Sequence, residues 1–245
     1  LTTHGASHLI LIGRSGVSTD DQRTALQALE NAGVKIEVFA ADVSKPEDVT
    51  QLLAQTSNLR GVVHAAGVLD DGMLMHQSPK RFLKVAGPKV SGAWNLHIQT
   101  KDLPLDFFVL FSSVASIIGS PGQSNYAAAN AFMDGLAHHR KHQGLVATSI
   151  NWGPWSDVGM AASDVVLQRL MKDGWQPMNA SQGCDFIRHL LKVCKLPQAA
   201  VLPVDWRQFA TSIPGAVNWN ILNDLVSKEQ SNPLLGNSAE LAAQR

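Results

Sequence analysis

The sequence predicts an α/β fold built on a doubly wound parallel sheet with helices on both faces. Short apolar runs alternate with segments of helical periodicity along most of the chain. The runs are rich in Val, Ile, Leu and Phe and rarely alternate with polar residues, which is typical of strands that are buried on both faces. With 245 residues, 45% of them hydrophobic, the chain can bury a sizeable core. The expected architecture is therefore Rossmann-like.

The elements follow one another in a regular order. Strands are expected at about 8–12, 34–40, 61–67, 107–111, 145–152 and 199–204. Helices are expected at about 20–32, from 46, at 79–98, from near 126 and at 184–196. Residues 19–21 suit the cap of the first helix, and Ser44 is the candidate N-cap of the second.

The only tyrosine lies in the stretch from Phe107 to Met133, where a strand ends in Ser113 and a helix begins near Tyr126. Tyr126 and Asn130 are four residues apart, so they share one face of a helix. Ligands of doubly wound sheets bind at the carboxyl ends of the strands. Residues at these ends are Arg14, Asp42, Ala65, Ala66, Gly67, Ser113 and the run 151–154.

Charge and composition exclude several classes of partner. The formal net charge is zero and the longest basic run is 138–142, so nucleic acid is not an expected partner, and the run is expected to close a helix. No apolar run has the length of a membrane span. Cys184 and Cys194 lack metal-ligand spacing; a disulfide is an alternative to the reduced, cytosolic pair that we expect. No metal site is predicted.

Seven strings, in consistent order, resemble the ketoreductase domain of modular polyketide synthases, a branch of the short-chain dehydrogenases and reductases. They are HLILIGRSG, AADVS, GVVHAAGVLDDGML, GPKVSGAWNLH, FSSVASIIGSPGQSNYAAANAF, SINWGPWSDVGM and VLPVDW. The resemblance covers about 1–209. It implies NADPH-dependent reduction of a β-ketoacyl thioester, held by phosphopantetheine on an acyl carrier protein, during polyketide chain extension in the cytoplasm. The other domains of the same synthase are further implied partners.

The resemblance also implies roles for four side chains. Tyr126 would donate the proton, and Ser113 would hydrogen-bond to the same carbonyl oxygen. Lys89 would lower the pKa of the tyrosine and hold the nicotinamide ribose, while Asn130 would position the lysine and a proton-relay path. Many related reductases place the lysine four residues after the tyrosine, where this chain has Asn130. In the polyketide branch the lysine comes from the preceding helix, as Lys89 does here.

A set of residues is expected to bind the cofactor. Arg14 follows the first strand, where an arginine accommodates the 2′-phosphate of NADPH. The full set is Arg14, Ser15, Asp42, Val43, Ala65, Ala66, Gly67, Lys89 and Tyr126. Ser15 is equally suited to a turn and Asp42 to a helix cap. The small residues 65–67 allow close approach of the backbone, although they also suit ordinary packing.

Product configuration is also implied by the resemblance. Leu69, Asp70 and Asp71 match the LDD motif of B-type ketoreductases, which form the D-β-hydroxyl, and Ile118 stands where A-type members carry tryptophan. Gln123 completes the expected substrate and stereocontrol set. From composition alone, residues 70–72 would be a plain turn.

The start of the chain departs from a complete Rossmann-type domain. No G-x-G-x-x-G turn occurs, and the first residues resemble the end of a first helix. We expect the first strand and glycine-rich turn to be lacking; in the order 3-2-1-4-5-6 that strand lies between the strands at 8–12 and 61–67. Its absence would leave unpaired edges and impair folding and cofactor binding of these residues alone.

The domain organisation follows from the same patterns. Residues 1–227 are expected to form the catalytic subdomain, with a lid at 154–174, and residues 228–245 an interdomain linker. Three alternatives are a non-catalytic structural domain, a carrier-bound epimerase and a free-standing dehydrogenase. The presence of all four site residues argues against the first, and the displaced lysine argues against the third.

Overall fold

A computed structural model describes residues 2, 5–157, 159, 164–193, 196–213, 219–222 and 225. The chain divides into two compact units, which we describe separately. The first comprises Leu1–Ile150 with Leu196–Ala199, and the second comprises Asn151–Lys195 with Ala200–Arg245.

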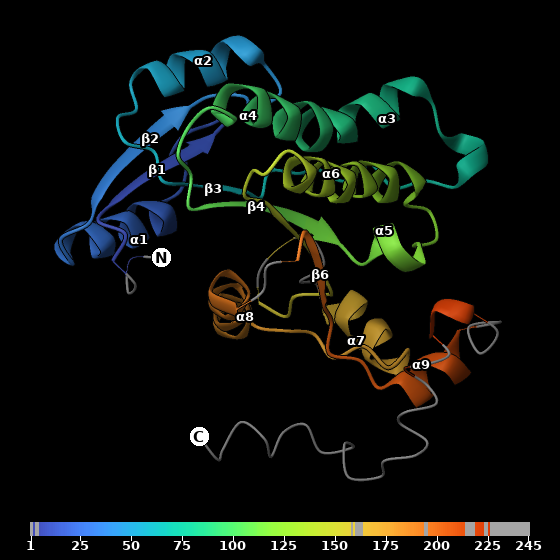
Figure 1. Ribbon diagram of the computed structural model, residues 1–245. Coiled ribbons are helices and arrows are strands. Elements are labelled where there is room, and N and C mark those ends of the chain that lie inside the picture. The colour runs from blue at the N-terminus through green and yellow to red at the C-terminus, as the bar shows by residue number, and fades with distance from the viewer. Residues whose placement is uncertain are drawn as a thin grey trace. The chain divides into compact units, whose positions relative to one another are not determined.

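The strands form two sheets, and the pairs β1–β2 and β3–β4 are parallel (Figure 1). β1 (His8–Gly13) pairs with β2 (Lys35–Ala40) along its whole length, from His8 opposite Lys35 to Gly13 opposite Ala40. β3 (Gly61–His64) pairs with β4 (Phe107–Ser113), and β5 (Thr148–Trp152) and β6 (Gln198–Val201) complete the order β3-β4-β5-β6. The predicted parallel α/β fold is confirmed.

β1 and β3 are edge strands of their sheets. Within the described residues, no strand pairs with the second edge of either one. Leu11 and Ile12 on β1 are each 37% exposed and Val63 on β3 is 40% exposed, which is unusual for apolar side chains on strands of this composition. The sequence analysis expected a missing strand between β1 and β3, and this stays a prediction.

The first two helices begin as local chemistry dictates, with one correction. α1 (Asp20–Asn31) is capped by Thr19, whose hydroxyl accepts the N–H of Gln22 in a reciprocal capping box. The N-cap of α2 (Pro46–Ala54) is Lys45, so the prediction of Ser44 as its N-cap was wrong. The Ser44 hydroxyl donates to Asp42 Oδ1 at 2.7 Å instead, within a tight turn at the end of β2.

The helix predicted at 79–98 is divided into three segments. α3 (Pro79–Ala86) passes into a π-helical segment, η3 (Gly87–Ser91), and then into α4 (Gly92–Thr100). Pro88 has no N–H to donate to a preceding turn, so it favours a change in the helical hydrogen-bond pattern at this point. The π-helical segment contains Lys89.

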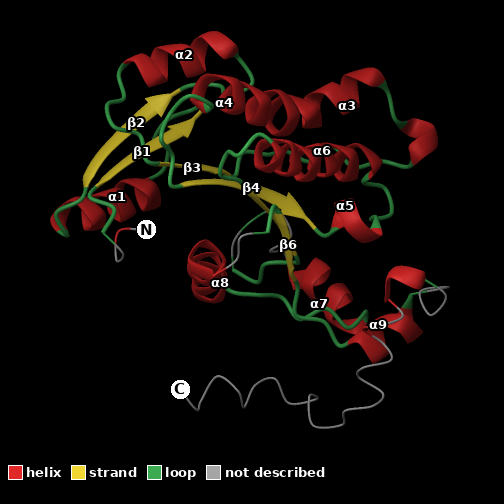
Figure 2. Ribbon diagram, in the orientation of Figure 1, coloured by secondary structure: helices red, strands yellow, loops and turns green. Residues whose placement is uncertain are grey.

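The core of the first unit lies between the second sheet and the helices that cover one of its faces (Figure 2). α5 (Ala115–Ile118) and α6 (Ser124–His142) follow β4, and the 3-10 segment η2 (Leu74–His76) precedes α3. The basic run closes α6, as predicted. Buried core residues include Val49, Val62, Ala93, Leu96, Leu105, Phe108, Leu110, Met133, Leu136, Ala137 and Ala147.

The second unit contains α7 (Asp164–Lys172), α8 (Ala180–Val193), α9 (Trp206–Ser212) and η5 (Asn220–Leu222). The strand predicted at 199–204 ends at Val201, because Pro203 cannot donate to a ladder, and Val204 forms only an isolated bridge with Trp175. Strands β3 and β5 are likewise shorter than predicted. The linker predicted at 228–245 and Cys194 lie outside the described residues; Cys184 is exposed and unpaired.

No helix in the described part of the chain is long and apolar enough to cross a membrane.

Two helical glycines predict opposite effects of the same substitution. A Cβ on Gly92 would lie 2.8 Å from Val43 Cγ2 and 3.2 Å from His64 Cε1, whereas a Cβ on Gly135 of α6 would meet no described atom within 4 Å. We expect Gly92→Ala to lower the free energy of unfolding by about 1–3 kcal/mol through overpacking. Gly135→Ala should raise it by about 0.5–1 kcal/mol, because alanine favours the helix. Urea denaturation measures both, and stabilisation by Gly92→Ala would contradict this packing.

Candidate active site

Four predicted site residues meet where β4 ends and α6 begins. Ser113 is the last residue of β4, Tyr126 and Asn130 lie on successive turns of α6, and Lys89 reaches them from the π-helical segment. The side chain of Lys89 is buried, with only 3% of the residue exposed. Its Nζ donates to Asn130 Oδ1 at 2.9 Å and to the Phe111 carbonyl at 3.1 Å, and lies 5.1 Å from the centroid of the Tyr126 ring.

Asn130 is fully buried and its amide is held at both ends. Its Oδ1 accepts from Lys89, and its Nδ2 donates to the Tyr126 carbonyl at 2.8 Å. An ammonium can only donate and a carbonyl can only accept, so these partners fix the orientation of the amide. A lysine at position 130 would place a second cation beside the Lys89 ammonium.

Burial lowers the pKa of Lys89 to about 8, and the charge of Asp134 opposes that shift. Asp134 is 7% exposed and accepts hydrogen bonds of 2.6 Å from both the Ser116 and Ser149 hydroxyls. The sequence analysis missed this residue. Its spacing of eight from Tyr126 and four from Asn130, which places all three on one face of α6, was the available signal.

The pKa of Tyr126 is raised, chiefly by burial, and the nearby Asp71 charge adds to the increase. Hydrogen bonds with the side chains of Asn130 and Ser113 act in the opposite direction. Lys89 is not among the causes of this shift, so the expectation that it lowers the pKa of Tyr126 stays a prediction. The ammonium faces the ring and donates to an amide and a carbonyl, so desolvation of the phenol dominates.

Residues 65–67, predicted to approach a cofactor, follow the end of β3. A Cβ on Gly67 would lie 3.0 Å from Lys89 Cε, so the absence of a side chain there makes room for the lysine. The neighbouring His64 is buried, and burial lowers its pKa to about 4, which keeps its imidazole neutral. Ala65 is exposed and Ala66 half-buried.

The carboxyl ends of β1 and β2 bring Arg14 and Asp42 to one edge, since Gly13 lies opposite Ala40. Asp42 Oδ1 accepts from the Ser44 N–H at 2.9 Å and from its hydroxyl; these bonds, with a smaller contribution from the Arg14 charge, lower the pKa of Asp42. Arg14 and Ser15 are exposed. An exposed cation beside an acceptor carboxylate fits the phosphorylated ribose and base of an adenine nucleotide.

Val43 differs from the other predicted cofactor residues. Its side chain packs against the core, and its carbonyl accepts from Asn95 Nδ2 at 2.9 Å. These contacts direct the side chain inward rather than towards a nucleotide at the sheet edge.

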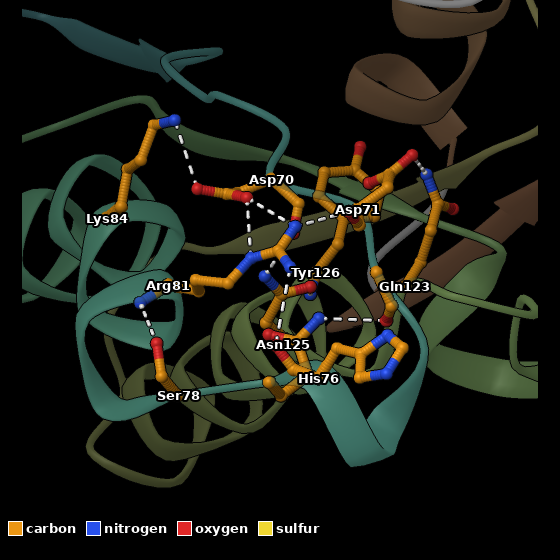
Figure 3. A network of polar contacts seen from close by, with 11 residues as sticks. Asp70, Asp71, His76, Ser78, Arg81, Lys84, Gln123, Asn125 and Tyr126 are labelled. Carbon is orange, nitrogen blue, oxygen red and sulfur yellow. Dashed lines mark hydrogen bonds and ion pairs between the residues drawn. The ribbon is translucent and has the colours of Figure 1, made fainter.

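The predicted stereocontrol residues are only partly brought together (Figure 3). Gln123 Nε2 donates to Asp71 Oδ2 at 2.9 Å. The Asp70 carboxylate contacts Arg81 and Lys84 of α3, which the sequence analysis did not single out. Leu69 is half-buried. No group of metal-ligating side chains occurs among the described residues.

Comparison with known proteins extends these observations. A model of the KR domain family matches residues 1–157. Polyketide synthase GfsA of Streptomyces halstedii is 41% identical over 219 residues, which cover 88% of this chain and 3% of GfsA. Phenolphthiocerol synthesis polyketide synthase type I Pks15/1 of Mycobacterium marinum is 42% identical over 200 residues, which cover 79% of this chain and 10% of that protein. The chain thus spans a small part of these relatives.

Solved structures are also similar. One described as "Structure of A-type Ketoreductases from Modular Polyketide Synthase" has a TM-score of 0.80 at 34% identity, covering 87% of this chain and 48% of that chain. Another, "The first ketoreductase of the tylosin PKS", has a TM-score of 0.77 at 36% identity, covering 84% of this chain and 45% of that chain.

The charge of Asp134 generates a direct test of the site's electrostatics. Asp134→Asn keeps the size of the side chain and removes the charge that favours protonated Lys89, so the pKa of Lys89 should fall below about 8. NMR titration of the lysine side-chain carbons measures it. Asp106→Asn, which removes an exposed carboxylate paired with Arg60, serves as the control and should leave that pKa unchanged. An unchanged Lys89 pKa in Asp134→Asn would show that the two groups are not coupled.

Proposed function

Because this chain belongs to the KR domain family, the ketoreductases of polyketide synthases, we propose that it reduces a β-ketoacyl thioester on an acyl carrier protein with NADPH. KR domains are oxidoreductases of the short-chain type that use NAD(P)H. The observation that supports catalysis by this chain is the contact of Lys89 with Asn130 beneath Tyr126, with Ser113 hydrogen-bonded to the same tyrosine.

The chemistry requires a proton donor at the ketone oxygen. Bound NADPH supplies a hydride to the carbonyl carbon, so negative charge develops on oxygen. The Tyr126 phenol is protonated at neutral pH and transfers its proton to that oxygen; because burial raises its pKa, the transfer depends on the negative charge that the hydride places on the oxygen. The Ser113 hydroxyl, which is oriented by the Ala115 N–H at 3.2 Å, hydrogen-bonds to the same oxygen.

The Lys89 ammonium lies over one face of the Tyr126 ring. Two of its three ammonium hydrogens are used by Asn130 and the Phe111 carbonyl. The third would donate to the nicotinamide ribose and so hold the cofactor beside Tyr126. Asn130 fixes the lysine and, through the Tyr126 carbonyl, the turn of α6 that carries the phenol; it also lies on the proposed proton-relay path.

The preference for NADPH rests on Arg14. At the end of β1 an arginine, rather than a carboxylate, is available to meet the adenosine ribose, and the Asp42 carboxylate is held by Ser44. Ser15 and the backbone of residues 65–67 complete the proposed cofactor contacts. The pyrophosphate would need groups beyond these, since no G-x-G-x-x-G turn is present in the sequence.

The finer assignments belong to the same proposal. The Leu69-Asp70-Asp71 motif and Ile118 support B-type selectivity and a D-β-hydroxyacyl product. The carrier protein, its phosphopantetheine-linked chain and the neighbouring domains are proposed partners, because the polyketide synthase relatives are much longer than this chain. The reaction is also proposed to occur in the cytoplasm, as the resemblance of the sequence motifs implies.

Removal of the phenol hydroxyl tests the proton-donor assignment. We expect Tyr126→Phe in the full-length polypeptide to lower turnover of a 3-oxoacyl thioester at least about 100-fold while NADPH binding is retained, because the general acid is lost. Ser124→Ala is a matched control: it removes a buried hydroxyl two residues earlier that has no hydrogen-bond partner among the described residues. Turnover in Tyr126→Phe equal to that of the control would exclude the assignment.

The pKa of Lys89 predicts the basic limb of the pH profile. With that pKa lowered from 10.5 to about 8, the ammonium is present below pH 8 and is lost as the pH rises through this value. Turnover should therefore decline above about pH 8. In Lys89→Arg the limb should vanish, even if the overall rate is lower, because guanidinium stays charged. Initial rates between pH 6 and 10 measure this, and an unchanged limb in the variant would assign it to another group.

A further inference from the structure

The loop formed by residues 69–72 lies between α3 and the start of α6, and both contact it (Figure 3). The Gly72 N–H donates to the Gly122 carbonyl at 2.7 Å, and Gln77 Nε2 donates to the Gly72 carbonyl at 2.9 Å. Neighbouring segments therefore hold both sides of this short loop.

Arg81 holds the loop from α3. Its Nε donates to Asp70 Oδ1 at 2.8 Å, and its Nη2 lies 2.7 Å from the same oxygen and also donates to the Asp71 carbonyl. One planar guanidinium thus binds a side chain and the backbone of consecutive loop residues, a geometry that a lysine cannot reproduce. Lys84 Nζ lies 3.0 Å from Asp70 Oδ2, but the side chain of Lys84 is 60% exposed.

Asn125 holds the loop from α6. This residue is 2% exposed, and its Nδ2 donates to the Asp70 carbonyl at 2.8 Å. Its Oδ1 accepts the Tyr126 N–H at 2.8 Å, a donor in the first turn of the helix, where backbone N–H groups lack helical partners. A single buried amide therefore joins the loop to the backbone of the proposed proton donor.

These contacts decide what the two aspartates can do. The carboxylate of Asp70 is directed onto α3 and bound there by two cations, so it is committed to holding the loop rather than to contacting a substrate. Asp71 faces the other way, towards Gln123, and its charge is felt by Tyr126. Through Asn125 the loop adjoins the turn of α6 that carries Tyr126.

We propose that Arg81 and Asn125 are positioning residues that clasp the 69–72 loop to the Tyr126 helix and thereby fix which face of the ketone receives the hydride while its oxygen meets the proton donor. This rests on the proposed function. The two faces of a ketone give opposite configurations at the hydroxyl, so a displaced loop admits the thioester from either side of Tyr126. Loss of the clasp then reduces selectivity more than it reduces rate.

Four variants distinguish a role of the clasp from the effect of losing an exposed ion pair with Asp70. Arg81→Gln removes the guanidinium that binds both the Asp70 carboxylate and the Asp71 carbonyl. Asn125→Asp keeps the acceptor for the Tyr126 N–H but removes the donor to the Asp70 carbonyl. Lys84→Gln is the matched control, because it removes a cation from the same carboxylate without touching the loop backbone. Arg81→Lys keeps the positive charge but cannot bind the Asp70 carboxylate and the Asp71 carbonyl together, so it should restore only part of the selectivity lost in Arg81→Gln.

Two measurements on the full-length polypeptide decide the matter. Chiral chromatography of the 3-hydroxyacyl product should show the ratio of enantiomers falling about tenfold in Arg81→Gln and Asn125→Asp, the effect of about one charge-assisted hydrogen bond, with turnover changed much less. Hydrogen exchange of segments 69–77 and 122–126 should become faster in both variants. The Lys84→Gln protein should match the unsubstituted protein in both respects.

Unchanged exchange in Arg81→Gln would show that no clasp exists, and faster exchange with an unchanged enantiomer ratio would show that the clasp does not control configuration; either result overturns the proposal. If the unsubstituted protein reduces no 3-oxoacyl thioester, the proposed function fails and the stereochemical role fails with it. The exchange measurement, which needs no turnover, still distinguishes that outcome from the absence of a clasp.

Discussion

The active-site arrangement depends on one buried hydrogen bond, from the Lys89 ammonium to the Asn130 amide. It joins the π-helical segment to α6, and the second bond of the ammonium joins both to the end of β4. A buried cation is costly unless its hydrogens are bonded. The Asn130 amide and the Phe111 carbonyl accept two of these hydrogens, and the more distant Asp134 charge favours the protonated form. The same Asn130 amide that accepts from Lys89 also binds the Tyr126 carbonyl, so the hydrogen bonds of the lysine help to fix the position of the tyrosine.

The π-helical segment and the glycines around it are consequences of the same constraint. Lys89 needs room beside the end of β3, which Gly67 supplies by lacking a Cβ, and α4 needs close packing on Val43 and His64, which Gly92 allows. The change in helical pattern at 87–91 places the lysine in that space. The packing of the core and the position of the Lys89 ammonium therefore depend on the same residues, all of which lie in the first unit.

The contacts proposed for proton transfer differ from those proposed for the configuration of the product. The proposed proton transfer uses side chains beneath and beside the tyrosine, whereas the loop at 69–72 is held by α3 and by the first residues of α6. Asn125 and Asn130 divide these tasks. One amide faces the loop and the other faces the lysine, and each also binds the backbone of Tyr126. The helix that carries the phenol thus links both parts of the site.

The sequence by itself determined the parallel α/β fold, the capped first helix and the basic end of α6, because these depend on periodicity and on neighbours within about four residues. It also named Tyr126, Asn130, Ser113 and Lys89 through ordered motifs. Only the tertiary structure decided the partners of Lys89, which lie 22 and 41 residues away, the π-helical segment, the role of Asp134 and the raised pKa of Tyr126. Burial and long-range contacts set these properties, so the spacing on α6 and the position of Pro88 were not enough to identify them.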